Sequence, residues 1–264
     1  MRFEYRSKLF DIEGVSQNDH IYKSILRSES FYEIDLLEYI YHLKSHVQSK
    51  KNKCVVIDVG ANIGNHSIFL GAFIADHLIA VEPNPDVLPT LRKNLSKNID
   101  NYTLYEHAVG EHEGTASIEV PSNMSENIGT AKIDLKNNEG SIEILTLDSM
   151  LSSWKEYESG SVSVSFIKID VEGMELQVLK GGQETMLRHK PHIFAEAATS
   201  EELERIINYL QPLGYRKLPG RWAATPVHHF ACNPDFSLIK VSFCAQLKGV
   251  VRKKISRIKR VFAG

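Results

Sequence analysis

Short apolar runs alternate with amphipathic stretches along most of the chain. The runs at 55–59, 77–81 and 164–169 are rich in β-branched residues and end at Gly, Pro or acidic residues, which is typical of buried strands. Residues 65–75 and 86–98 instead repeat their apolar positions at helical spacing. The first part of the chain therefore alternates strand with helix.

The same pattern continues toward the C-terminus with further elements. It predicts strands at 102–110, 114–122, 141–151 and 192–198, helices at 174–190 and 200–214, and a closing antiparallel pair of 215–218 with 228–233. Strands that alternate with helices favour a mostly parallel sheet with helices on both faces, so we expect an α/β fold.

Both ends of the chain depart from this pattern. Residues 16–48 have apolar positions at helical spacing, with Ser16 or Asn18 as the N-cap, and predict helices. We therefore divide the chain into a helical N-terminal cap (1–50), one large α/β domain (51–245) and a C-terminal tail (246–264).

Composition places the chain among ordinary globular proteins. Of its 264 residues, 42% are hydrophobic and 24% are charged. Cys54, Cys232 and Cys244 lie far apart, so the sequence predicts neither a disulfide framework nor a zinc site. The N-terminus lacks the apolar segment of a signal peptide. We therefore expect a cytoplasmic protein.

Charge is unevenly distributed and singles out the tail. Residues 247–264 hold seven basic residues and no acid, which leaves 24 basic against 33 acidic residues elsewhere, a net charge near −9. An apolar stripe at helical spacing runs through the tail at Leu247, Val251, Ile255, Ile258 and Phe262. A basic amphipathic helix over 247–262 could bind an anionic membrane surface, at the inner face of the membrane. Alternatively, its apolar stripe could pack against its own domain or against a second subunit in a homodimer. The acidic body argues against nucleic acid.

A glycine-rich turn follows the first predicted strand of the domain. Gly60 and Gly64 allow a tight turn and close backbone approach to a ligand. Ligands of such sheets bind outside the carboxyl ends of the strands. Asp58 precedes the turn, and Glu82 ends the next strand, where a carboxylate can accept both hydroxyls of a ribose.

The turn suits a cationic nucleoside better than a dinucleotide. The dinucleotide fingerprint requires three glycines or a final alanine, and here Asn62 and Asn65 occupy two of its positions. A carboxylate at Asp58 would repel a pyrophosphate but would attract the ammonium or sulfonium of S-adenosylmethionine. The alternative is that Asp58 caps the helix and Glu82 is a solvated strand end.

Acidic and basic residues also end two later strands. Lys168, Asp170 and Glu172 alternate, which places them on one face if the chain stays extended. An alcohol that acts as a nucleophile has to lose a proton, so we interpret Asp170 or Glu172 as the base or hydroxyl-orienting group, with Lys168 setting its charge. A structural ion pair is the alternative. Glu196 ends the adjacent strand and could help to chelate a metal ion.

Several of these segments, in this order, resemble the FkbM family of S-adenosylmethionine-dependent methyltransferases. They are VIDVGANIGNHS, AVEPNP, AVGEHEG, LTLDSM and FIKIDVEGMELQVLKGG, and FYE at 31–33 and ENIGT at 126–130 resemble elements of one branch of the family. The resemblance implies a class I methyltransferase Rossmann-like fold with a seven-stranded sheet. It also implies methyl transfer, commonly to a hydroxyl of a sugar, polyketide or lipid-linked glycan.

The resemblance assigns roles to individual positions. Those that match the cofactor motifs are Asp58, Gly60, Asn62, Gly64 and Glu82, with Ala108 and Val109 beside the adenine. The places of other residues in the sequence, and not the resemblance, suggest the acceptor side. These candidates are Tyr32, Glu33, His66, Asn127 and Glu196, although Tyr32 and His66 could be packing residues and the loop around Asn127 a solvated insertion.

We therefore expect an O-methyltransferase that uses S-adenosylmethionine and acts on a hydroxylated small molecule, sugar or glycan. No metal site is assigned. Three alternatives stay open: a metal-dependent small-molecule O-methyltransferase, a cofactor-binding module without activity, and an NAD-dependent oxidoreductase.

Overall fold

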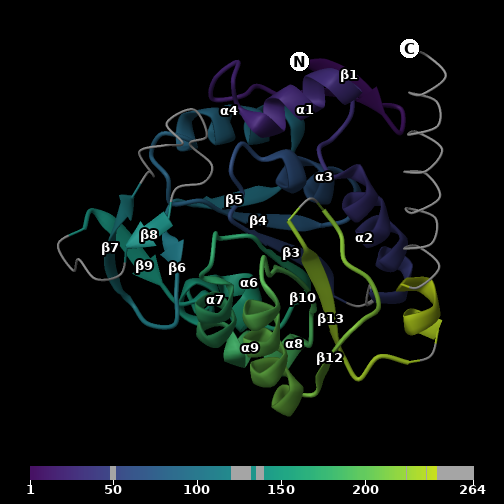
Figure 1. The fold of residues 1–264 in the computed structure, drawn as a ribbon, viewed down its shortest axis with the longest axis vertical. Helices are drawn as coiled ribbons and strands as arrows, with labels where there is room; N and C mark the ends of the chain where they lie inside the picture. The colour runs from purple at the N-terminus through teal and green to yellow at the C-terminus, as the bar shows by residue number, and fades with distance from the viewer. Residues whose placement is uncertain (48–51, 120–131, 135–139, 224, 236, 243–264) are drawn as a thin grey trace.

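A twisted seven-stranded sheet forms the centre of the protein in the computed structural model (Figure 1). The structure describes residues 1–47, 52–119, 132–134, 140–223, 225–235 and 237–242. In spatial order the strands are β12 (Tyr215–Lys217), β13 (Val227–Cys232), β11 (His192–Glu196), β10 (Val162–Ile169), β3 (Lys53–Val59), β4 (His77–Val81) and β5 (Tyr102–Tyr105).

All neighbouring strands from β11 to β5 are parallel, whereas β13 is antiparallel to both β11 and β12. This is the class I methyltransferase arrangement implied by the family resemblance. The predicted antiparallel pair at the end of the domain is confirmed.

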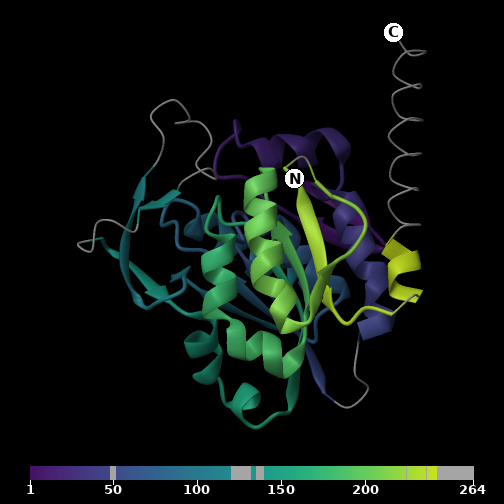
Figure 2. The same ribbon diagram turned by 60° about the horizontal axis from the view of Figure 1, so that its bottom comes forward.

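Helices cover both faces of the sheet, as the strand sequences require. Along β3, Cys54 and Val56 belong to one buried cluster and Val55, Ile57 and Val59 to another, because successive side chains point to opposite faces. The first cluster packs under α2 (Ile34–Val47), α3 (Asn65–Phe73) and α4 (Leu88–Asn98). The second packs under α5 (Leu147–Ser152), α7 (Glu175–Gly181), α8 (Gln183–His189) and α9 (Ser200–Leu210), beside the short α6 (Lys155–Glu158) and η2 (Gln211–Leu213) (Figures 1 and 2).

The N-terminal region begins with a hairpin that the helical prediction missed. Strands β1 (Arg2–Tyr5) and β2 (Lys8–Asp11) pair antiparallel and precede α1 (His20–Ser28). Arg6 and Ser7 form the turn between them and both have positive φ. Glycine or asparagine usually occupies such positions and indicates a hairpin in the sequence, and neither is present here. Helix α1 is capped by Asp19, which accepts from the backbone N–H of Tyr22, and not by Ser16 or Asn18.

Two asparagines of α4 hold the extended chain that follows the hairpin. The side-chain amide of Asn94 accepts from the backbone N–H of Glu13 at 2.9 Å and donates to its carbonyl at 2.8 Å, and Asn98 does the same with Asp11. Asn94 also donates to the carbonyl of Ile63 in the glycine-rich turn at 2.7 Å. The N-terminal region is therefore tied directly to that turn.

The protein also has a second, small sheet, and two strands were predicted with the wrong extent in this region. It has the order β6 (Ala108–Val109), β9 (Ile142–Leu145), β7 (Gly114–Glu119), β8 (Lys132–Asp134). The predicted strand 102–110 is split, because its first part pairs with β4 and its end pairs with β9. The predicted strand 141–151 stops at Leu145, where Thr146 caps α5 by accepting from the backbone N–H of Ser149.

The predicted helix over 174–190 is also interrupted. It is divided into α7 and α8 at Gly181 and Gly182. A side chain at Gly181 would lie 2.0 Å from the carbonyl oxygen of Gly110, so this glycine lets α7 approach the backbone of the neighbouring segment.

Some predicted features lie outside the described residues. They are Asn127, most of the loop around it, and the basic tail from residue 243 onward. The boundaries at 50 and 245 stay predictions. Among the described residues, none of the helices has both the length and the apolar character needed to cross a membrane.

The glycine-rich turn is fixed by contact with the end of β10. Gly60 has φ +81°, and a Cβ atom placed there would lie 1.8 Å from the carbonyl oxygen of Asp170. Gly173 also has a positive φ, of +102°, but a Cβ atom there would meet nothing within 4 Å. At Gly60, therefore, a side chain is excluded both by the backbone conformation and by a steric clash, whereas at Gly173 only the backbone conformation disfavours it.

We expect Gly60→Ala to destabilise the protein by at least about 3 kcal/mol, because the β3 and β10 ends must move apart. Gly173→Ala, which adds only backbone strain, should cost about 1–2 kcal/mol. Equilibrium denaturation of both variants checks this. Equal losses would contradict the proposed steric role of Gly60.

Candidate active site

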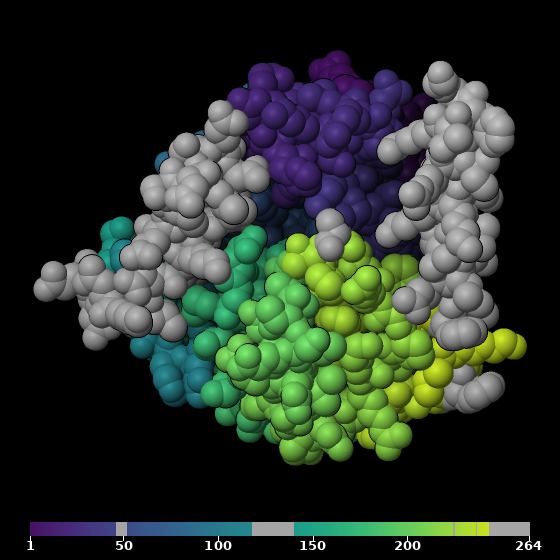
Figure 3. Space-filling view, in the orientation of Figure 1, coloured from purple at the N-terminus to yellow at the C-terminus, as the bar shows by residue number. Residues whose placement is uncertain are grey.

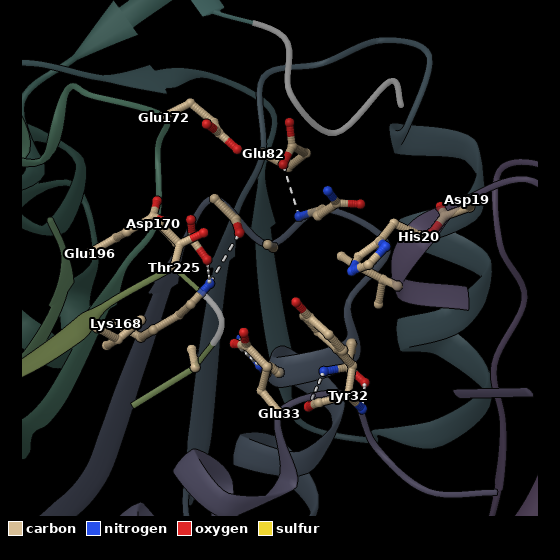
Figure 4. A pocket seen from close by; sticks show the side chains of 18 of the residues that line it. Asp19, His20, Tyr32, Glu33, Glu82, Lys168, Asp170, Glu172, Glu196 and Thr225 are labelled. Carbon is tan, nitrogen blue, oxygen red and sulfur yellow. Dashed lines mark hydrogen bonds and ion pairs between the residues drawn. The ribbon is translucent and has the colours of Figure 1, made fainter. Parts of the chain in front are cut away.

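A cavity of about 290 Å³ lies at the carboxyl ends of β3, β4, β10 and β11. It is found where the N-terminal region, purple in Figure 3, meets the yellow-green segment around β13. Most predicted site residues line it together: Tyr32, Glu33, Gly60, Asn62, His66, Glu82, Lys168, Asp170, Glu172 and Glu196. Figure 4 shows the labelled side chains of this set around one space.

Glu82 is held at the end of β4 by the glycine-rich turn. Its Oε2 accepts from the backbone N–H of Asn62 at 2.8 Å, and its Oε1 accepts from that of Asn84 at 2.9 Å. Burial raises the pKa of Glu82, while these two hydrogen bonds oppose the rise. Each oxygen retains a lone pair, so the carboxyl group can accept further hydrogen bonds from a ligand in the cavity.

The second glycine of the turn serves packing and helix initiation. Gly64 has φ +88° and is the N-cap of α3. A Cβ atom there would lie 2.9 Å from Cδ1 of Leu91, so the glycine lets the turn pack on α4. The N-terminus of α3 consequently faces the cavity through Asn65 and His66.

Lys168 is buried between two carboxylates. Its Nζ lies 3.2 Å from Oδ1 of Asp58 and 3.3 Å from Oδ2 of Asp170, and it donates to the carbonyl of Gly60 at 3.4 Å. Burial alone would lower the pKa of Lys168, but the charges of Asp58 and Asp170 outweigh it and raise that pKa. Lys168 is therefore a fixed cation.

Asp58 lies behind the cavity wall and does not face the cavity. It is fully buried, pairs with Lys168 and accepts from Oγ of Ser67 at 2.6 Å. Because β3 alternates its side chains, Asp58 points to the α3 face of the sheet. Its carboxylate is thus engaged by Lys168 and Ser67. The expected contact of Asp58 with a cationic ligand stays a prediction.

Asp170 and Glu196 share a hydrogen bond at the ends of β10 and β11. Burial raises the pKa of Glu196 to about 9, and the neighbouring Asp170 adds to the rise. Although burial opposes it, the charge of Lys168 lowers the pKa of Asp170. At neutral pH Asp170 is thus ionised, and Glu196 carries a proton.

Tyr32, Glu33 and His66 close the cavity from the N-terminal side. Nε2 of His66 lies 3.5 Å from Oε2 of Glu33 and has no hydrogen-bond partner among the described residues. Burial lowers the pKa of His66 to about 3, so its ring is neutral. The rings of Tyr32 and His66 stack with centroids 6.4 Å apart, and Asn65 holds the backbone of Tyr32 through two hydrogen bonds of 2.9 and 3.0 Å.

Other predicted positions are placed elsewhere. Ala108 and Val109 are buried in β6 and are not part of the described cavity wall. Sequence reasoning in turn missed Asp19 and His20 from the start of α1, and Thr225 from the segment before β13. Only the packing of distant segments brings these residues to the cavity, so the sequence carries no local signal for them.

The described residues contain no group of three or more His, Cys, Asp or Glu side chains placed to hold a metal ion.

Comparisons with known proteins agree with the geometry. The family model of the methyltransferase FkbM domain matches residues 58–217. The hexuronic acid methyltransferase AglP of Haloferax volcanii is 36% identical over 128 residues, which cover 48% of this chain and 49% of that protein. The 2-O-methyltransferase NoeI of Sinorhizobium fredii is 28% identical over 167 residues, which cover 57% of this chain and 65% of that protein.

The chain thus spans about half to two thirds of the length of these relatives. Among solved structures, a methyltransferase FkbM from Methylobacillus flagellatus is similar with a TM-score of 0.47 and 21% identity, over 76% of this chain and 48% of that one. Since the family model matches more than half of the 264 residues, and its match begins at the strand that precedes the glycine-rich turn, this protein belongs to the FkbM methyltransferase family.

Proposed function

We propose that the protein transfers a methyl group from S-adenosylmethionine to a hydroxyl of a sugar or glycan. Membership of a methyltransferase family supports the reaction class. The name of one relative, a hexuronic acid methyltransferase, supports a sugar as the acceptor, and the name of the other, a 2-O-methyltransferase, supports an oxygen as the atom that is methylated. The single observation that carries the proposal is the meeting of Glu82 and Asp170 in one cavity around the glycine-rich turn.

The residues around the turn fit the cofactor. Glu82 can accept hydrogen bonds from the two ribose hydroxyls, because both of its oxygens are oriented by backbone N–H groups. Gly60 and Asn62 are partly buried and line the cavity, so a ligand can reach the turn there. The N-terminus of α3 favours a carboxylate such as that of the methionine moiety. S-adenosylmethionine would supply a methyl group made electrophilic by its sulfonium.

The acceptor hydroxyl needs an orienting group that also takes up its proton. In the transfer a bond forms between the acceptor oxygen and the methyl carbon, the carbon–sulfur bond breaks, and the electron pair stays on sulfur. Asp170 is ionised, lines the cavity and can accept the hydroxyl hydrogen bond. We assign the proton to this carboxylate, from which the hydrogen-bonded pair with Glu196 can release it to water.

Lys168 holds Asp170 in position rather than acting on the acceptor. It touches Asp170 on one side and Asp58 on the other, and its donor to Gly60 fixes the turn against β10. Because the low pKa of Asp170 makes it a weak base, its contribution is chiefly orientation of the hydroxyl. Glu172, which also lines the cavity, is the second carboxylate at this strand end.

Titration calorimetry with S-adenosylhomocysteine, and separately with NADH, tests the cofactor site. We expect saturable binding of the former and none of the latter. Glu82→Gln should weaken S-adenosylhomocysteine binding by about tenfold or more, because charge-assisted hydrogen bonds to the ribose are lost.

Glu175→Gln is the matched control for this test. Glu175 is also a buried glutamate that accepts from two backbone N–H groups, those of Val171 and Gly173, but it is not part of the cavity wall. It should lose stability without losing affinity. Equal loss of affinity in both variants would indicate that Glu82 is structural.

Asp170→Asn should lower the methyl-transfer rate by about 100-fold or more, because the hydroxyl loses its orienting carboxylate. Binding of S-adenosylhomocysteine should be retained. Turnover, followed as S-adenosylhomocysteine formation, measures the loss with acceptors found by screening sugars.

Asp58→Asn provides the comparison, since it removes the other carboxylate from Lys168 without altering the cavity wall. An equal loss of turnover in Asp58→Asn would show that Asp170 acts only by holding Lys168. Full turnover in Asp170→Asn would refute its role altogether.

The shared proton of Glu196 predicts a pH-dependent stability. Its pKa is raised to about 9 in the folded protein, so between the ordinary range of a carboxyl group and pH 9 the folded state keeps a proton that the unfolded chain has lost. Stability from this group is full at low pH and is lost as pH rises. Denaturation midpoints should therefore fall with rising pH more steeply in the native protein than in Glu196→Gln. The exposed Glu156→Gln should keep the native slope; the same slope in all three would contradict the shared proton.

A further inference from the structure

The wall of the cavity has a marked excess of acidic groups. Its described carboxyl side chains are Asp19, Glu33, Glu82, Asp170, Glu172 and the protonated Glu196, whereas Lys168 is its one ammonium or guanidinium group within the described residues. Even without Glu196, five carboxyl groups face one ammonium group. They come from the N-cap of α1, the segment before α2, the chain directly after β4 and after β10, and the end of β11, so the excess surrounds the space instead of lying on one side (Figure 4).

Lys168 does not offset this excess for an incoming ligand. An ammonium group has three N–H donors. Those of Lys168 are directed at Asp58, Asp170 and the carbonyl of Gly60, at 3.2, 3.3 and 3.4 Å. An anionic ligand would have to displace a protein carboxylate to reach this cation.

The remaining polar groups are suited to hydroxyl groups. His66 is neutral, and its Nε2 is buried against the cavity without a hydrogen-bond partner among the described residues. Carboxylate oxygens accept hydrogen bonds, and a sugar hydroxyl can donate one to each. Because the N-terminus of α3 is assigned to the carboxylate of the cofactor, a sugar carboxylate or phosphate would meet the remaining carboxylates of the wall, and their like charge would repel it.

We propose that the cavity selects an acceptor without negative charge, a neutral polyhydroxyl sugar, and rejects an acidic one, in contrast to the hexuronic acid named for the relative AglP. The inference rests on the proposed function, since it names the acceptor class of that same site. Charge complementarity of this kind gives specificity, because a like charge next to a desolvated carboxylate is penalised. An amino sugar, whose ammonium suits the acidic wall, would be tolerated.

Three methyl glycosides that share one ring test the charge preference: those of glucose, glucosamine and glucuronic acid. Their binding to the protein saturated with S-adenosylhomocysteine is followed by ligand-observed NMR titration. We expect the glucose and glucosamine compounds to bind at least about tenfold more tightly than the glucuronic acid compound.

Equal or tighter binding of the glucuronic acid compound would overturn the inference. The same conclusion would follow if S-adenosylhomocysteine binds and none of the three sugars does. If S-adenosylhomocysteine itself does not bind, the proposed function fails first, and the calorimetric titration reports that separately.

Charge removal identifies the groups responsible. Glu33→Gln and Glu172→Gln should each improve binding of the glucuronic acid compound relative to the glucose compound by about threefold or more. The exposed Glu156→Gln, on α6, removes the same charge away from the cavity and should leave the ratio unchanged. An equal change in Glu156→Gln, or no change in either cavity variant, would show that the wall does not set the preference.

Discussion

The burial of the Lys168 ammonium between Asp58 and Asp170 is the constraint on which the site depends. Removing such a charge from water costs several kcal/mol unless partners replace the lost hydration. Here the partners come from β3, the end of β10 and the glycine-rich turn, so all three must be in register. Parallel pairing of Lys168 opposite Asp58 supplies that register.

The glycine-rich turn is shaped by the protein as much as by a ligand. The carbonyl of Asp170 occupies the position that a side chain at residue 60 would need, and α4 occupies the position next to residue 64. Asn94 then links the same turn to the N-terminal region through Ile63 and Glu13. Cavity, turn and N-terminal cap are thus one packed unit, and the shape of the cavity is set by contacts between segments far apart in sequence.

The sequence predicted those parts of the fold whose signals are local. The buried strands, the glycines, Glu82 and the acids after β10 could be identified because apolar runs and strand ends fix where their side chains lie. The N-terminal hairpin could not, since its turn uses Arg6 and Ser7. Asp58 was correctly placed in the strand, but which partner its carboxylate meets depends on the pairing of β3 with β10. Asp19 and Thr225 reach the cavity through tertiary packing, for which the sequence has no spacing rule.

The protonation pattern of the site follows from the same buried lysine. One ammonium can compensate Asp58 and Asp170, but the third carboxyl group at this edge, Glu196, has no cation of its own among the described residues that line the cavity. Two adjacent carboxylates without a second cation cannot both ionise cheaply, so Glu196 retains its proton and donates it toward Asp170. The arrangement keeps Asp170 ionised and oriented while adding no further charge beside it. Among the described residues of the wall, Lys168 is thus already engaged by two carboxylates, and the proposed preference for an uncharged acceptor would follow from the same ion pairs that stabilise this edge of the sheet.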